Sequence, residues 1–316
     1  MPTLQKSCEF SHDSFFVCNS LGFYEFNIYF IYFLCLNETI CYDLSLKGVN
    51  IEHKFMKSIL LFLLLFITVL LSGQNINTAT PFSGQGNSCV ELSSPYSLFY
   101  NQAGISRTTH SIVGLSYSEK FHEEEFSTKT LFAIHPFKWA VAALDYERFG
   151  SSSYYEEQFG LSIARLLTKN LSIGFRLKYA HSFVNKYKNN HTAYNVDMGI
   201  QYTLPLDFVI AIHITNPFIY QDKLSEQLVK AGIGWVNNNL TVSYEYDIIF
   251  DDYDFHLFGL SLNVLDNIDI RAGYSTIGNT RYMGVGYLYH NYYFSISFSM
   301  HESLGVSSAV SVHYEF

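Results

Sequence analysis

The last part of the sequence alternates regularly between apolar residues and polar or small ones. From 309 to 316 the even-numbered residues are apolar and the odd-numbered residues are polar or small, and the same rule holds from 294 to 301. A period of two places successive side chains on opposite faces of a β-strand. The two segments therefore predict two strands, separated by a turn around Glu302, that each have one apolar and one polar face.

The same alternation recurs from Ser111 to the end of the sequence. In 171–179, for example, the odd-numbered residues are apolar, whereas the even-numbered residues include Arg176 and Lys178. The segments are about ten residues long, near the length that a tilted strand needs to cross a bilayer. We count about fourteen, an even number as in single-chain bacterial barrels, with twelve or sixteen as alternatives. Their approximate centres are Leu115, Thr130, Ala143, Leu161, Phe175, Met198, Ile210, Ala231, Tyr244, Leu260, Ile270, Val285, Ile296 and Val310.

The composition favours a membrane barrel over a soluble β-protein. Aromatic residues make up 17% of the chain and charged residues only 15%, against about 25% charged residues in soluble chains. Mean hydropathy is only +0.09, too low for a bundle of apolar helices. A barrel with one face toward lipid and one toward a polar lumen combines these properties. We therefore predict an all-β fold, a transmembrane antiparallel β-barrel, with a soluble β-sandwich or propeller as the alternative.

A signal for export lies inside the chain. Residues 59–71 form the longest apolar run, preceded by Lys57 and followed by small and polar residues. This order is typical of a secretory signal peptide, and the run is shorter than the ~20 residues of a transmembrane helix. We expect translation to start at Met56, residues 56–74 to be the signal peptide and residues 1–55 to be an upstream extension from a misplaced start. A genuine N-terminal extension is the alternative.

The segment after the signal peptide has no strand pattern. Residues 75–109 are rich in Ser, Asn, Gly and Pro, and we interpret them as a short irregular plug that precedes a barrel formed by 110–316. The Gly84–Gly86 stretch follows no strand and opens no helix, so we interpret it as a flexible segment and not as a nucleotide-binding loop. Cys89 is the single cysteine after Met56, which leaves no intramolecular disulfide and no cysteine metal site there.

The polar face of the strands carries the candidate site. One interpretation is a polar, gated passage, and the other is a set of ion pairs that neutralise one another inside a closed barrel. The inward residues are Asp145, Glu147, Arg176, Lys178, Asp197, Glu245, Asp247 and Arg271.

The sequence shows no catalytic or cofactor-binding arrangement. His301 and Ser303 are close, but no motif of a serine nucleophile accompanies them, and the acidic stretches 122–125 and 251–254 lack the pattern of a calcium loop. The formal net charge of −9 comes with no basic patch, which excludes nucleic acid as a partner. We predict a protein that is not an enzyme and that takes no cofactor.

Three segments resemble one family. Tyr96–Ser106 is similar to an Asn-Pro-Ala-Gly motif before the first strand of FadL-like and PorV/PorQ-like outer-membrane barrels, with Gln102 in place of the proline. Glu157–Arg165 resembles the fourth strand of a Bacteroidetes subgroup, and His301–Phe316 resembles its C-terminal end. The matching motif residues are Asn101, Ala103 and Gly104 near the start and His301, Leu304, Gly305, Ser307, Ser311, Tyr314 and Phe316 at the end.

The resemblance implies a fourteen-stranded barrel with an N-terminal hatch in the outer membrane of a Gram-negative cell. It implies a role as an accessory to type IX secretion or surface-protein assembly, with secretion components as partners. The alternative is a FadL-like passive transporter of small hydrophobic molecules. It further implies that Tyr314 and Phe316 form the signal that the barrel-assembly machinery recognises, with outer-membrane lipid around the wall.

Overall fold

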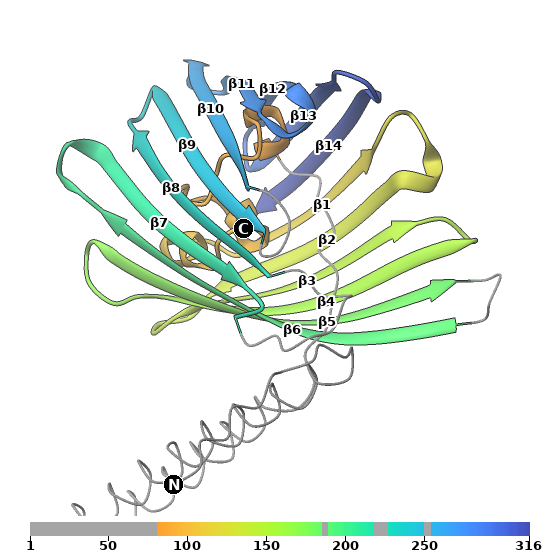
Figure 1. Cartoon of the computed structure of the whole chain (residues 1–316). Helices are drawn as coiled ribbons and strands as arrows, with labels where there is room; N and C mark the ends of the chain where they lie inside the picture. The colour runs from red at the N-terminus through yellow and green to blue at the C-terminus, as the bar shows by residue number, and fades with distance from the viewer. Residues whose placement is uncertain (1–80, 185–188, 218–226, 250–253) are drawn as a thin grey trace, which may run out of the picture. The chain divides into compact units, whose positions relative to one another are not determined.

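The computed structural model describes residues 81–184, 189–217, 227–249 and 254–316. These residues form fourteen strands that follow one another in sequence order around a closed barrel (Figure 1). All neighbouring strands are antiparallel, and β1 pairs with β14 from Ile112↔Glu315 to Glu119↔Ser308 to close the wall. The predicted fold class and strand number are confirmed. The strands are β1 (Ile112–Glu119), β2 (Ser127–Pro136), β3 (Val141–Gly150), β4 (Tyr154–Leu166), β5 (Leu171–Val184), β6 (Asn189–Thr203), β7 (Phe208–Thr215), β8 (Leu228–Val236), β9 (Leu240–Ile249), β10 (Asp254–Leu265), β11 (Ile268–Ser275), β12 (Thr280–Tyr289), β13 (Tyr292–His301) and β14 (Gly305–Glu315).

Each predicted strand centre falls within a strand, and the tightest turns, of two residues each, lie at the end of the barrel where β14 stops. One such turn is His290–Asn291 between β12 and β13. The connection between β5 and β6 is short, because the pairing of these two strands extends to Val184↔Asn189. The expected upstream extension and signal peptide lie outside the described residues, as do residues 251–253 of the acidic stretch 251–254.

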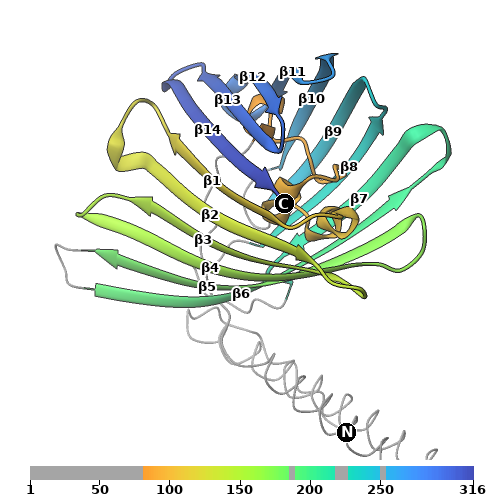
Figure 2. The ribbon, with the colours of Figure 1, turned by 180° about the vertical axis from the view of Figure 1, so that it is seen from behind.

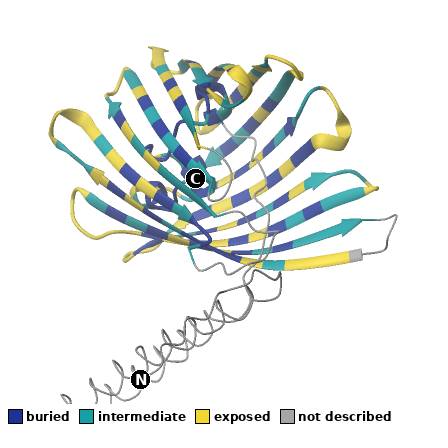
Figure 3. Ribbon diagram, in the orientation of Figure 1, coloured by how far each residue is buried: buried dark blue, intermediate teal, exposed yellow. Residues whose placement is uncertain are grey.

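The outer face of the wall is apolar. Large side chains such as Leu161 and Ile296 are 53% and 51% exposed, although they sit at the middle of regular strands. Buried and exposed residues alternate along the strands as bands (Figure 3). A wall that exposes its apolar side chains and buries its polar ones is the reverse of a soluble sandwich, and it suits a lipid environment.

The pairing between β6 and β7 is the least extensive part of the wall. β7 accompanies β6 only from Asp197↔Thr215 to Thr203↔Val209, and Asn216 adds a backbone hydrogen bond to Val196 at 2.9 Å. Among the described residues, the first part of β6, from Asn189 to Asn195, pairs only with β5.

Residues 81–107, which we call the plug, lie inside the barrel, as the orange segments in Figure 2 show. The plug consists of three short 3₁₀ helices, η1 (Pro81–Gln85), η2 (Pro95–Phe99) and η3 (Gln102–Arg107). The helix η1 packs against β10 to β13, whereas η3 packs against β4, β5 and β6. No helix among the described residues has the length and apolar character of a membrane-spanning helix.

An apolar core joins the plug to one side of the wall. From the plug it includes Leu92, Tyr96 and Leu98, and from the strands it includes Phe132 on β2 and Val141 on β3. These side chains are almost completely buried. Burial of this kind stabilises the plug through the hydrophobic effect at about 25 cal/mol per Å². The opposite side of the lumen, from β5 to β9, is lined mainly by polar and charged side chains.

Candidate functional site

All eight predicted lumen residues lie on the inner face of the wall and are buried. Their exposed fractions range from 0% for Glu245 to 6% for Arg271. The period of two explains this placement, because each of these residues is an even number of positions away from the other inward-facing residues of its strand. Two of them come from β3 (Asp145, Glu147), two from β5 (Arg176, Lys178), one from β6 (Asp197), two from β9 (Glu245, Asp247) and one from β11 (Arg271).

Arg176 on β5 is the centre of the first ion-pair group. Its Nη2 atom contacts Asp145 and lies 2.9 Å from Oε1 of Glu147, both on β3. The strand β4 lies between them, and a Cβ at Gly160 would fall on the Asp145 carboxylate. The glycine therefore provides the space through which the carboxylate reaches the guanidinium. Such a pair is stable in a buried position only when its partners are all present.

The other predicted lumen residues also have charged partners. Lys178 Nζ lies 3.0 Å from Asp197 Oδ2, and Arg271 contacts Asp269 on its own strand. Ion pairing is therefore the arrangement that the structure gives to these side chains. Their role in a passage remains a prediction.

Lys230, which is not among the predicted lumen residues, is the centre of another ion-pair group. Its Nζ atom lies 2.9 Å from Glu245 Oε1 and 2.8 Å from Asp247 Oδ2. The alternation of Lys230, Gly232 and Gly234 with apolar residues on β8 is the signal that could have placed Lys230 on the inner face. The glycines obscured it, because a residue without a side chain does not mark either face.

Polar side chains of the wall hold the plug by its backbone. Glu245 Oε2 accepts hydrogen bonds from the amides of Cys89 and Val90, at 2.8 and 2.9 Å. The Nε2 group of Gln201 on β6 donates to the carbonyls of Val90 and Leu92, at 3.0 and 2.9 Å. The segment around Val90 thus bridges two sides of the lumen.

The motif residues Asn101, Ala103 and Gly104 are buried at the start of η3. The Nδ2 group of Asn101 donates to the Val90 carbonyl at 2.7 Å, and its Oδ1 accepts from the Ala103 amide at 3.1 Å. A Cβ at Gly104 would lie 2.6 Å from the Ser97 Cβ. The motif therefore shapes the fold of the plug itself.

Glycines of the wall provide the surface on which the plug rests. Gly174 and Gly199 are paired across β5 and β6, and a Cβ on either would overlap residues 101–103 of the plug. Gly86 likewise packs on the backbone of β10 and β11, where a Cβ at Gly273 would overlap it. The 84–86 stretch is buried, so its glycines serve close packing and not the flexibility that we expected.

Aromatic rings fill the space between the plug and the wall. The Tyr96 ring lies 5.3 Å from Phe132 on β2 and 5.4 Å from His313 on β14, measured between centroids. Two neighbouring plug rings face lumen cations, because Phe99 lies 5.5 Å from the Arg176 guanidinium and Tyr100 lies 5.9 Å from Lys230. Cation–π attraction of this kind is worth ~0.5–2 kcal/mol.

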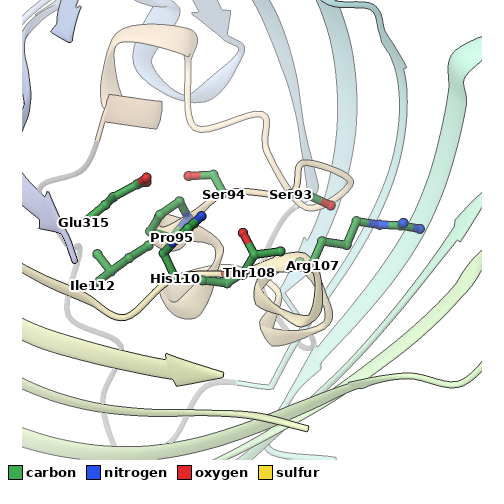
Figure 4. Close-up of a pocket in the computed structure, with 10 residues that line it drawn as sticks. Ser93, Ser94, Pro95, Arg107, Thr108, His110, Ile112 and Glu315 are labelled. Atoms are coloured by element: carbon green, nitrogen blue, oxygen red, sulfur yellow. The ribbon is translucent and has the colours of Figure 1, made fainter. Parts of the chain in front are cut away.

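A pocket of about 190 Å³ opens at the base of the plug, at the end of the barrel where β1 begins and β14 stops (Figure 4). Arg107 points away from the other labelled residues and donates to Lys169 O and Thr203 Oγ1, at 3.3 and 3.1 Å. The pocket is thus bounded by the plug on one side and by the wall on the other. Its lining residues are Ser93, Ser94, Pro95, Gly104, Arg107, Thr108, Thr109, His110, Ile112 and Glu315.

The C-terminal residues lie on the outer face at the seam. Phe316 is 67% exposed, its ring is 4.9 Å from that of Tyr314, and its amide donates to Ser111 O at 2.9 Å. This position is compatible with recognition by another protein before the seam closes. The role of Tyr314 and Phe316 as an assembly signal stays a prediction.

No arrangement of catalytic or metal-ligating groups emerges within the described ranges. The Nδ1 atom of His301 accepts from the backbone amides of Ser303 and Leu304, so this nitrogen does not activate the Ser303 hydroxyl. No group of three or more His, Cys, Asp or Glu side chains in the described part of the chain has the geometry of a metal site.

Solved structures share this fold, whereas sequence comparison finds no relative. No protein-family model and no curated protein matches the sequence. The Ralstonia pickettii toluene transporter TbuX matches with a TM-score of 0.59 at 11% identity over 77% of this chain and 99% of its own. The Pseudomonas putida toluene transporter TodX matches with a TM-score of 0.58 at 9% identity, over 78% and 99%. A Pseudomonas aeruginosa FadL homologue matches with a TM-score of 0.54 at 10% identity, over 78% and 100%.

Proposed function

We propose that this protein is an outer-membrane barrel that admits small hydrophobic molecules by passive transport. The observation that carries the proposal is that a closed fourteen-stranded wall encloses a plug formed by the same chain. The fold is similar over nearly the full length of TbuX and TodX, which are toluene transporters. A plug held by side-chain contacts and not by strand pairing can shift without breaking the wall.

Two further features support transport. The aromatic rings between the plug and β2 give apolar molecules a favourable surface inside the lumen. The pocket beside Pro95 and Ile112 lies at the end where the tight turns lie, which is the periplasmic end in barrels of this type.

Transport is tested with toluene as the probe. Cells that express the chain from Met56 in a Gram-negative host should take up radiolabelled toluene at low concentration faster than cells with an empty vector. A matched variant, Glu123→Gln in the exposed β1–β2 connection, should behave as the parent does. Equal uptake with and without a correctly inserted barrel contradicts the proposal, and heat-modifiable mobility on gels verifies insertion.

The role in type IX secretion or surface assembly is the second candidate. It rests on the sequence resemblance at the C-terminal end, from His301 to Phe316, whereas the fold comparisons support the transport role better. Deletion of the gene followed by proteomics of the cell surface distinguishes the two. Loss of surface proteins favours the secretion role, and an unchanged surface with slower toluene uptake favours transport.

A further inference from the structure

Glu91 is a buried acid in the plug whose carboxyl group has no hydrogen-bond partner on any other described residue. The residue lies between η1 and η2 and is 1% exposed. Neither carboxyl oxygen accepts a hydrogen bond from another residue in the described part of the chain. An ionised carboxylate without hydrogen bonds or a paired cation is costly to bury.

The wall is shaped to receive this side chain. Gly232 and Gly234, both on the inner face of β8, lie directly under it. A Cβ at Gly232 would lie 2.6 Å from Oε2 of Glu91, and a Cβ at Gly234 would lie 2.6 Å from its Cγ. Larger residues at these positions would displace Glu91, so the contact is built into the sequence of both the plug and the wall.

The surrounding charges do not neutralise Glu91. Glu245 and Asp247 face it from β9, and Lys230 faces it from β8. Lys230 already bonds both of those carboxylates, at 2.9 and 2.8 Å. On β7, His213 lies opposite Lys230 in the register, and on the plug the nearest titratable group is Cys89. The cluster thus contains three carboxyl groups and one ammonium group.

The acidity of Glu91 is set by its position in the plug, outside the strands of the wall. Burial raises the pKa of Glu91 well above its ordinary value, and the negative charge of Glu245 raises the pKa further. Its own backbone amide and Lys230 oppose this rise with smaller effects. Both observations, the missing partner and the raised pKa, favour the neutral acid.

We propose that the seated plug holds Glu91 in its protonated form, and that ionisation of Glu91 releases residues 88–92 from β8 and β9. The proton on Glu91 is then the ligand that keeps the plug in its position inside the lumen. Ionisation of Glu91 is sufficient for release, because the free energy of the carboxylate is lower in water than in the buried position between Gly234 and Glu245.

The direction of the pH effect follows from linkage. The seated state binds the proton more tightly than the released state, in which Glu91 has an ordinary pKa of ~4.5. Seating is therefore most favourable below that value. It weakens as the pH rises, until the pH passes the raised pKa of the seated plug. Each pH unit in this interval changes the ratio of seated to released plug by up to about tenfold.

Cys89 is a natural reporter for release. It is buried next to Glu91, and its Sγ atom lies 3.1 Å from Asn87 O. Burial raises the pKa of this thiol, so that the seated plug keeps it unreactive. The full chain, expressed from Met56 and inserted in outer membranes, is labelled with a membrane-impermeant maleimide after the membranes are opened to both sides. The rate is divided by that of denatured protein at the same pH, which removes the intrinsic reactivity of the thiol.

The expected result is a normalised labelling rate that rises about tenfold or more between about pH 5 and about pH 9. Glu91→Gln keeps the shape of the side chain without the charge, so this variant should remain slow at both ends. The matched control, Glu123→Gln in an exposed connection, should follow the parent. A normalised labelling rate of the parent that does not change with pH overturns the proposal. A Glu91→Gln variant whose rate rises with pH as steeply as that of the parent also overturns it. Gel mobility of the unheated barrel verifies that each variant is folded.

Discussion

The amide of Val90 lies 2.9 Å from the carboxylate of Glu245, so a charged residue of β9 directly holds the backbone of the plug. The same oxygen also accepts from the Cys89 amide, while the second oxygen accepts from Lys230. Charge-assisted hydrogen bonds of this kind are about twice as strong as neutral ones. Glu245 is therefore a charge-assisted attachment of the plug to the wall.

Glu245→Ala should loosen the plug. The change removes the acceptor of two backbone amides, and a hydrogen bond to a charged group is worth ~1.5–3 kcal/mol. We expect Cys89 labelling to accelerate by about tenfold or more at about pH 5, where ionisation of Glu91 contributes least. Ser243→Ala is the matched control, because it removes only neutral hydrogen bonds to the plug: the Ser243 hydroxyl donates to Ser88 O at 3.0 Å and accepts from Gln85 Nε2 at 3.2 Å. Equal rates in the two variants would contradict the special role of Glu245.

Arg176→Met should destabilise the barrel. It leaves Asp145 and Glu147 buried without their cation, which costs ~3–5 kcal/mol when a buried pair loses one partner. The thermal midpoint of the heat-modifiable transition on gels should fall. The triple variant with Asp145→Asn and Glu147→Gln should recover most of the loss, because no charge is then left unpaired. A triple variant as unstable as the single one indicates that packing, and not charge, governs this group.

Gly199→Ala should push η3 away from the wall. The added Cβ would overlap Oδ1 of Asn101, and overpacking of this kind costs ~1–3 kcal/mol. Faster labelling of Cys89 is the expected readout, because Asn101 also holds the Val90 carbonyl. Asn101→Ala should cost less in the Gly199→Ala background than in the parent, since the overlap is relieved. Additive effects would show that the two residues do not act on each other.

Deletion of Phe316 should lower the yield of inserted barrel. The ring is exposed at the β1–β14 seam and packs only on Tyr314 among the described rings, so its loss should change the stability of the folded barrel little. The fraction of heat-modifiable protein in the membrane measures insertion, and the thermal midpoint of that fraction measures stability. Phe316→Tyr keeps an aromatic ring and serves as the control. An unchanged yield after the deletion would remove Phe316 from the assembly signal.

The sequence predicts the wall better than the plug for a physical reason. A strand of the wall must present alternate faces to lipid and lumen, so the pattern around Arg176 and Lys178 gives both the strand and the inward direction. Glu91 has no such pattern, because the plug is irregular and its side chains follow no period. The pairing of Arg176 with Asp145 across Gly160 was equally hidden, since it depends on which strands become neighbours and on a missing side chain between them.

The contact between the Tyr96 hydroxyl and His313, at 3.1 Å, joins residues that are 217 positions apart in the chain. It cannot form until the last strand has reached the seam, because His313 belongs to β14. The plug is synthesised first, but this attachment is among the last to be completed. A C-terminus that fails to reach the seam will therefore leave two defects at once, an unclosed wall between β1 and β14 and a plug without its attachment at Tyr96.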